Sequence, residues 1–527
     1  MESSNSAYAQ LETAIVNISD FIWGGVWDGN QIVPFGPIAV LLLGAGLYLM
    51  IRLGGRPLRR FVPALVEVWK GRKGDGDPST ITPFQALSTA LSGQVGTGNI
   101  VGVAVAISVG GPGAIFWMWI TAIFGMALAF AESSLAIKYR ELDEYGRING
   151  GPMYYIKNGL GKGWGWLAVL FCIGTLISAS ATGGMVQANG IAQNIAQTIE
   201  PMGVSLPAIS LAGMNIDLTV VVIGAVLSAL VFIIIVGGIK SIGGVAERLV
   251  PIMAAVYIVA CLAVLIVDYK EIPHAFGMIF ASALGLDSAV GGVTGYAIIA
   301  AMRFGVARGL FSNEAGQGSA PIAHAASQMR NPSVQGEIAM IGVFIDTLVL
   351  CTMTALVILT AEGLWPTVET ARAMVGETTT HIWLAEGANP ATLTNQAFAD
   401  ALPGPIGGWM VTVCLALFAF TTIIGWSYYG EQALTYLVGE WATKPFRIAW
   451  VLVIFIGAIA KVDFVWLFGD IANATMVLPN LIAVLMLSGV VIAIHKRNGD
   501  PETEDGNSVI PHEHGVAALH VGEHDPQ

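Results

Sequence analysis

Residues 92–99 read Ser92-Gly93-Gln94-Val95-Gly96-Thr97-Gly98-Asn99 and lie in the middle of an apolar run that extends from 84 to 109. A run of that length can cross a bilayer as one helix. Its three central glycines and four polar side chains favour a break instead, because glycine weakens a helix and buried polar groups need partners. A second apolar run, 273–301, carries a comparable stretch, Ala283-Leu284-Gly285-Leu286-Asp287-Ser288-Ala289-Val290-Gly291-Gly292. Two broken helices in matching positions are typical of inverted-repeat secondary transporters, whose binding site lies at the breaks.

The composition places the chain in a membrane. Charged residues make up 11% of the 527 residues, whereas a soluble domain carries about 25%. Apolar residues make up 55%. These values exclude a soluble globule, and membrane lipid is the first partner that they imply.

Apolar runs bounded by charged or turn residues predict eleven helices. They fall at 33–51, 84–109, 113–137, 165–197, 218–238, 248–267, 273–301, 336–360, 405–436, 446–467 and 472–494. The stretch 302–335 is too polar and glycine-rich to span, and we interpret it as a membrane-edge segment.

Without the first helix, two five-helix halves remain, at 84–267 and 273–494. Because five is odd, the halves insert in opposite directions. We therefore predict an all-α polytopic membrane protein with about 11 transmembrane helices, namely one extra N-terminal helix and a 5+5 inverted repeat with two broken helices. Residues 1–83 then hold an external N-terminus, the extra helix and a basic cytoplasmic loop.

Two segments lie outside this plan. The acidic segment 361–404 is an external insertion, and the sequence leaves open whether it forms an ordered cap or a flexible loop. Residues 495–527 form a polar, acidic tail with four histidines, which we interpret as disordered and cytoplasmic rather than metal-binding.

The distribution of basic residues predicts the orientation. With the N-terminus outside and the C-terminus cytoplasmic, all Lys and Arg except Lys270, Arg372 and Lys461 fall in cytoplasmic segments, Arg303 and Arg308 included. No Lys or Arg precedes Arg52, so we expect no cleaved signal peptide and a retained first helix.

The first break offers chemistry for a zwitterion. The N-terminus of a half-helix presents free N–H groups and a positive dipole end to an anion. We therefore expect a substrate carboxylate at the N–H groups of Gly96, Thr97 and Gly98, and an ammonium at carbonyls of the other break. The alternative is that these glycines only permit close helix packing.

Polar side chains in other apolar runs extend the candidate site. Gln187 lies mid-helix, and the hydroxyls of Thr421 and Thr422 can bind a hard cation or bond back to their own helix. Glu132 and Asp346 are carboxyl groups inside apolar helices, where ionisable groups usually face a partner or the permeation path. We interpret Asp346 as a cation or proton site and Glu132 as a structural acceptor.

Several function classes are excluded or disfavoured. The chain has no GxxxxGK[ST], HExxH, GxSxG or CxxC motif, so neither an enzyme nor an ATP-driven pump is expected, and no cofactor is implied. The acidic residues gather at the ends and in 361–404, which argues against nucleic-acid binding. The four cysteines all lie in apolar stretches and are expected to be buried thiols.

Several long motifs, in order, resemble the alanine or glycine:cation symporter family, also called the sodium:alanine symporters. They are TPFQALSTALSGQVGTGNIVGVAVAI, GGPGAIFWMW, GGPMYYI, RFGVARGLFSNEAGQGSAPIAHAA and FTTIIGWSYYGEQAL, and the match covers about residues 35–495. The resemblance implies a leucine-transporter-like fold, sodium-coupled uptake of alanine and glycine, and a place in a prokaryotic inner membrane. The segments 362–400 and 498–527 depart from the family pattern.

The resemblance also implies roles for individual residues. Thr97 and Gly98 hold the substrate carboxylate, and the residues around the substrate are Gln187, Trp426, Phe280 and Ser282. The sodium site uses carbonyl oxygens of Ser92 and Val95 with the hydroxyls of Thr421 and Thr422. Asn99 and Asp346 are the candidates for a second cation.

Some alternatives stay open at this point. A proton-coupled symporter would titrate Asp346 or Glu132, and a passive channel or a membrane sensor would also need polar breaks. The stretch RFGVARGLFSNEAGQGSAP is interpreted as part of an inner gate, with Arg308 and Asn313 as its test positions. The preferred amino acid and enantiomer, the ion stoichiometry and the oligomeric state do not follow from the sequence.

Overall fold

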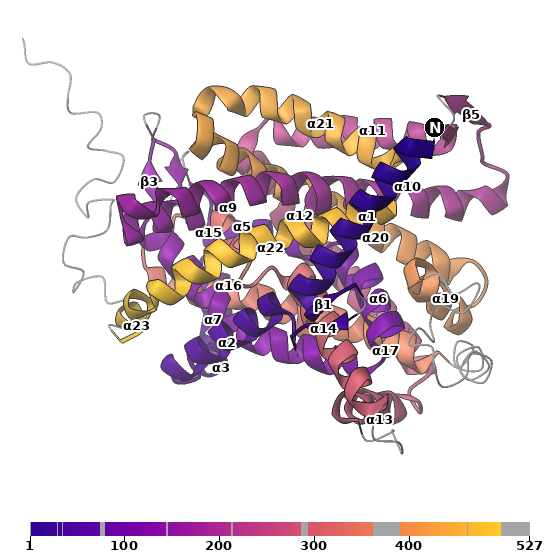
Figure 1. The fold of residues 1–527 in the computed structure, drawn as a ribbon, viewed down its shortest axis with the longest axis horizontal. Coiled ribbons are helices and arrows are strands. Elements are labelled where there is room, and N and C mark those ends of the chain that lie inside the picture. The colour runs from indigo at the N-terminus through magenta and orange to yellow at the C-terminus, as the bar shows by residue number, and fades with distance from the viewer. Residues whose placement is uncertain are drawn as a thin grey trace, which may run out of the picture.

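The computed structural model describes residues 2–28, 30–33, 35–73, 80–143, 146–211, 214–285, 293–361, 390–460 and 462–496. These segments form one helical bundle with three short two-stranded hairpins (Figure 1). The first elements along the chain are α1 (Glu2–Gly24), β1 (Val26–Trp27), β2 (Asn30–Gln31), α2 (Pro37–Arg52), α3 (Arg56–Arg59), α4 (Phe61–Lys70), α5 (Pro83–Gln94), η1 (Gly98–Gly102), α6 (Val103–Gly110) and α7 (Gly113–Lys138).

The middle of the chain continues the bundle. Its elements are β3 (Glu141–Leu142), β4 (Ile148–Asn149), α8 (Pro152–Tyr155), η2 (Ile156–Leu160), η3 (Lys162–Trp164), α9 (Gly165–Ser178), η4 (Ala179–Met185), α10 (Val186–Ile199), η5 (Glu200–Met202), β5 (Ala208–Leu211), β6 (Met214–Asp217), α11 (Leu218–Ile235), α12 (Gly238–Val267), α13 (Ile272–Leu284), α14 (Val293–Asn313) and α15 (Ala320–Ala325).

The last part of the chain completes the helical bundle. Its elements are α16 (Pro332–Val343), η6 (Phe344–Cys351), α17 (Thr352–Thr360), α19 (Pro390–Ala401), α20 (Ile406–Val438), η9 (Glu440–Ala442), α21 (Thr443–Ile459), α22 (Val462–Met486) and α23 (Ser488–Lys496).

The spanning helices agree in part with the prediction. Within the described residues, seven helices are long and apolar enough to cross a membrane, and nine if each of two bent pairs is one span. The predicted helix 33–51 corresponds to α2, which has only 16 residues. The predicted helix 273–301 is divided between α13 and α14, and 286–292, the larger part of its predicted break, lies outside the described residues.

The first predicted break is confirmed. The axes of α5 and of Gly98–Gly110 differ by 53° across Val95-Gly96-Thr97. The start of α5 is fixed by a capping box, in which Thr82 Oγ1 accepts from the N–H of Gln85 and the N–H of Thr82 donates to Gln85 Oε1. The local sequence therefore determines both ends of α5.

A second interruption lies at 314–319, between α14 and α15, and this corrects the interpretation of 302–335 as a membrane-edge segment. Glu314, Gly316 and Gly318 have φ values of 57°, 89° and 85°, which end the helix. Glu314 is only 1% exposed. The segment can enter the core because other helices satisfy its polar groups: Gln94 Nε2 donates to Asn313 O at 2.8 Å, for example.

The core brings the two interruptions together. Helix α7 packs against α14 and α16, while α5 contacts α12, α15 and α20. Helix α22, yellow in Figure 1, crosses the bundle beside α1. In the predicted insertion 361–404, residues 362–389 lie outside the described residues, but α19 packs on α6 and η1, and Thr394 Oγ1 donates to Ile100 O at 3.2 Å. The described part of the insertion is thus an ordered cover over the end of the first interruption.

One ion pair joins two residues that the sequence prediction assigns to opposite sides of the membrane. Arg303 of α14, assigned to the cytoplasm, pairs with Asp20 of α1, which belongs to the segment predicted to be external. The two assignments therefore exclude each other.

Candidate functional site

The first interruption exposes its backbone to two neighbouring helices. The N–H of Thr97 donates to Gln187 Oε1 of α10 at 3.0 Å, and the N–H of Gly96 donates to Asn99 Oδ1 at 2.9 Å. A Cβ on Gly96 would lie 2.5 Å from Thr422 Oγ1 of α20. Glycine is therefore required at 96 for the close approach of α20, and side-chain oxygens now occupy the acceptor positions at these N–H groups.

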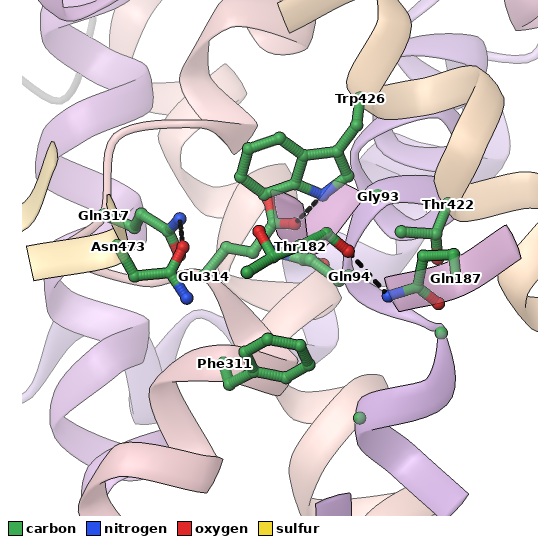
Figure 2. A pocket seen from close by; sticks show the side chains of 12 residues that line it. Gly93, Gln94, Thr182, Gln187, Phe311, Glu314, Gln317, Thr422, Trp426 and Asn473 are labelled. Atoms are coloured by element: carbon green, nitrogen blue, oxygen red, sulfur yellow. Dashed lines mark hydrogen bonds between the residues drawn. The ribbon is translucent and has the colours of Figure 1, made fainter. Parts of the chain in front are cut away.

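A pocket lies between the two interruptions (Figure 2). The cavity is narrow in this structure and has room for about one water molecule. The lining residues are Gly93, Gln94, Gly96, Gly98, Thr182, Gln187, Phe311, Glu314, Gln317, Thr422, Trp426 and Asn473. Trp426 and Phe311 lie on opposite sides of it in Figure 2, so the pocket suits a small, polar ligand.

Glu314 is the acidic group of the pocket. Its Oε1 accepts from Trp426 Nε1 at 2.8 Å, and its Oε2 accepts from Ser319 Oγ at 2.6 Å. In the described part of the chain, no Lys, Arg or His is hydrogen-bonded to it. An unpaired carboxylate buried in a membrane protein is costly and is usually retained for function. Glu314 is thus placed to receive a cationic group.

Two of the four predicted sodium ligands, Val95 and Thr422, meet at the first interruption. Thr422 Oγ1 lies 3.1 Å from Val95 O. Ser92 Oγ lies close to α20, since a Cβ on Gly425 would be 2.6 Å from it. Thr421 Oγ1 donates to Phe418 O at 2.9 Å and lies 3.4 Å from Met253 Sδ. The donor set of carbonyl and hydroxyl oxygens fits a hard cation, with Thr421 turned partly away.

The predicted second-cation pair is also brought together. Asn99 Nδ2 donates to Asp346 Oδ1 at 2.6 Å, and Ser312 Oγ donates to the same oxygen at 3.0 Å. Thr347 Oγ1 donates to Asp346 Oδ2 at 2.7 Å. Asp346 therefore links η1 to the end of α14 through neutral donors. Asn99 directs its nitrogen, not its oxygen, toward Asp346, so this pair fits a cation less well than Val95 and Thr422 do.

Glu132 is held differently. Asn480 Nδ2 donates to Glu132 Oε1 and, at 2.9 Å, to Gly316 O, and the hydroxyl of Tyr155 donates to Asn480 Oδ1. The carboxyl group thus helps to fix the second interruption, as expected of a structural acceptor.

The structure does not bring Phe280 and Ser282 to the pocket. Phe280 of α13 is 43% exposed and packs on Phe116 and Trp119, and Ser282 lies against Gly111. The residues that occupy the expected place are on 311–317 instead. Sequence reasoning missed Gln94, Thr182, Phe311, Glu314, Gln317 and Asn473. The available signal was an acidic residue within a glycine-interrupted stretch between two apolar runs, SNEAGQGS.

Asn313, one test position of the predicted inner gate, lies in the core rather than at the membrane edge. It is buried beside the pocket and donates to Thr347 Oγ1 at 3.1 Å. The two interrupted helices are closed against each other where Ile81 before α5 pairs with the chain after α15. The N–H of Ile81 donates to Ala326 O at 3.1 Å, and the N–H of Gln328 donates to Ile81 O at 2.8 Å.

Arg140 reinforces this closure. Its Nη1 donates to Ala325 O at 2.9 Å and to Ser327 O at 2.6 Å, and its Nη2 donates to Met329 O at 3.1 Å. The two interrupted helices are therefore joined at the end that the positive-inside distribution assigns to the cytoplasm.

Comparisons with known proteins agree with this architecture. A family model described as the sodium:alanine symporter family matches residues 17–509. The sodium/alanine symporter AgcS of Methanococcus maripaludis is 42% identical over 91% of this chain and 96% of its own length. An uncharacterized transporter of Haemophilus influenzae is 41% identical over 92% of this chain and 95% of its own length. Among solved structures, MhsT in complex with L-phenylalanine has a TM-score of 0.54 at 16% identity, over 80% of this chain and 93% of that one. This last likeness concerns the fold alone and agrees with the leucine-transporter-like arrangement.

Proposed function

Because the chain belongs to the sodium:alanine symporter family and is a secondary transporter, not an enzyme, we propose that it couples sodium entry to the uptake of small neutral amino acids such as alanine and glycine. The observation that carries the proposal is one pocket lined by Gly96 and Gly98 of the first interruption, by the buried carboxyl group of Glu314 and by Thr422. The Thr97 N–H and Val95 O lie next to it, bonded to Gln187 and Thr422 of its lining. A zwitterion and a cation fit these groups side by side.

The substrate carboxylate binds at the first interruption. It takes the place of Gln187 Oε1 at the N–H of Thr97, close to the start of η1, where the helix dipole favours an anion. Thr97 Oγ1 supports this assignment, since it is buried and has no hydrogen-bond partner among the described residues. A carboxylate oxygen would satisfy it.

The substrate ammonium binds at Glu314. This carboxylate lines the same pocket as Gly96, Gly98 and the Gln187 side chain that accepts from the Thr97 N–H, and the charges at these two places match the two ends of an amino acid. The neighbouring Phe311 and Trp426 limit the room for a side chain, which favours small substrates. A Cβ on Gly98 would lie 3.0 Å from Phe311, so this wall is close.

Sodium binds to Val95 O and Thr422 Oγ1, with Ser92 and Thr421 nearby. Sodium binding and substrate binding are coupled because the two sites are adjacent: Val95 precedes Gly96 and Thr97 in one short unwound segment. A cation that orders Val95 orders the neighbouring N–H groups as well, so the substrate binds more tightly when sodium is present.

The bundle supports an alternating-access cycle. We propose that the first repeat runs from α5 to α12 and that the second begins at α14, because α14–α15, not 283–292, contains the described second interruption. With the N-terminus outside, the Ile81 and Arg140 contacts close the cytoplasmic side and must separate when the pocket opens inward. The setting is a prokaryotic inner membrane.

Proton coupling is the second candidate, and a specific observation favours it. Glu132, Glu314 and Asp346 are all buried carboxyl groups that hydrogen-bond, among the described residues, only to neutral donors. Asp346 is the best placed, since it bonds to both interruptions. Here Asp346→Asn would abolish proton-driven uptake, whereas retained sodium-driven uptake would remove Asp346 from the coupling step.

The test is uptake of labelled alanine into proteoliposomes under an inward sodium gradient, compared with equal potassium and proton gradients. Accumulation with sodium alone supports the proposal. Accumulation of alanine with a proton gradient alone would instead assign the coupling to a carboxyl group that titrates. Equilibration of alanine without accumulation would indicate a facilitator.

A further inference from the structure

The end of the pocket that is remote from the first interruption is polar. In Figure 2, Gln317 and Asn473 lie together on the side opposite Gln187 and Thr422. Both line the pocket, and they are 1% and 3% exposed. If the carboxylate binds at Thr97 and the ammonium at Glu314, this end receives the substrate side chain.

Hydrogen bonds fix the orientation of the Asn473 amide. Its Oδ1 accepts from Ser178 Oγ at 2.6 Å and from Gln317 Nε2 at 2.9 Å. Ser178 is itself held, since Thr182 Oγ1 donates to Ser178 O at 2.8 Å. Asn473 Oδ1 therefore accepts two hydrogen bonds, and the amide nitrogen Nδ2 points away from Ser178 and Gln317 Nε2.

Two groups of this cluster keep unused capacity. Among the described residues, Asn473 Nδ2 has no acceptor, and Gln317 Oε1 has no donor. The pocket wall thus offers a donor next to an acceptor. A hydroxyl group is the small side-chain group that both donates and accepts, whereas a methyl group would leave Asn473 Nδ2 and Gln317 Oε1 without partners.

We infer that Gln317 and Asn473 form a side-chain subsite that selects substrates with a hydroxyl group, so that serine binds better than an apolar amino acid of equal size. The inference rests on the proposed function, because it uses the substrate orientation derived there. Alanine and glycine have no side-chain atom at the position of the serine hydroxyl and so place no apolar group against the two amides. Sites built to bond a hydroxyl discriminate strongly against analogues that lack it.

The test compares serine with 2-aminobutyrate, which has the same number of heavy atoms but ends in a methyl group. Each is used to inhibit sodium-driven uptake of labelled alanine into proteoliposomes. We expect serine to inhibit at a concentration at least about tenfold lower. Equal or stronger inhibition by 2-aminobutyrate would overturn the inference.

Variants assign the preference to the subsite. Asn473→Leu removes the donor at similar size, and the ratio of the two inhibition constants should fall toward one. Thr475→Val is the matched control on the same helix, since Thr475 Oγ1 bonds to Ala472 O at 2.7 Å and does not line the pocket. The control should keep the wild-type ratio, and a preference unchanged in Asn473→Leu would refute the assignment.

A second readout separates this inference from the proposed function. Thermal stabilisation of the detergent-solubilised wild-type protein by serine and by 2-aminobutyrate requires binding but no transport. If alanine does not accumulate, the proposed function fails, while greater stabilisation by serine would still support the subsite. Equal stabilisation by both would overturn it.

Discussion

Replacement of Thr422 by Val tests the cation site directly. Valine keeps the branched shape of threonine but has a methyl group where Oγ1 lies 3.1 Å from Val95 O. A hydrogen-bonding group next to a charge contributes about 1.5–3 kcal/mol. That energy corresponds to about a 10- to 100-fold loss in affinity for the ion.

The assay measures initial alanine uptake in proteoliposomes as a function of external sodium. In Thr422→Val, the sodium concentration for half-maximal uptake should rise by that factor. The apparent alanine KM should rise at fixed low sodium and recover at high sodium, because ion and substrate binding are coupled.

A matched control lies on the same helix. Thr412 of α20 is also buried, and its hydroxyl bonds to Gly408 O at 2.9 Å and to Thr198 Oγ1 at 2.7 Å, away from the pocket. Thr412→Val should leave the sodium dependence unchanged. An unchanged sodium requirement in Thr422→Val would refute the assignment of the ion to Val95 and Thr422.

Four further outcomes are expected. Glu314→Gln should raise the KM for alanine by at least about tenfold, because the neutral amide cannot neutralise the ammonium, and a KM within twofold of wild type would exclude the contact. Phe280→Ala should leave the alanine KM unchanged, since Phe280 packs on Phe116 of α7 and does not line the pocket, and a large increase would restore the sequence-based assignment. Arg140→Gln should speed thiol labelling of an added Ile81→Cys by about tenfold or more, because it weakens the contacts to 325–329, and equal labelling rates would argue against this closure. Gly457→Ala should lower the melting temperature, because its Cβ would overlap Met185 at a cost of about 1–3 kcal/mol, whereas Gly244→Ala, with open space around it, should not.

The two interruptions differ in how far the sequence predicted them. The first lies in a run whose apolar flanks are long enough to define one spanning helix, so three glycines at its centre stand out. The second lies in SNEAGQGSAP, whose polarity resembles that of a surface loop. It is buried because Gln94, Asn480 and Trp426 from three other helices satisfy its polar groups, and no local pattern records such distant partners.

The residues of the candidate site were likewise predicted only in part from the sequence. Gly96, Thr97 and Gly98 were predicted because they share one break, and Gln187 and Thr422 because they are polar residues in apolar runs. The family motif added Val95 and Trp426. The resemblance placed Phe280 and Ser282 at the substrate, next to the second break expected at 283–292, whereas Phe311 and Glu314 line the described pocket. The difference is one of position along the chain, since apolar length alone does not distinguish a peripheral helix such as α13 from a core one.

By itself, the sequence determined that the chain is a helical membrane protein with a broken helix at 92–99, because hydrophobic length, charge and glycine content act locally. Only the tertiary structure decided that Glu314, Gln317 and Asn473 meet in one pocket with Gln187. These residues lie up to 286 positions apart, for Gln187 and Asn473, and they are brought together by helix packing. That packing depends on the contacts of the whole bundle, which no single stretch of sequence contains.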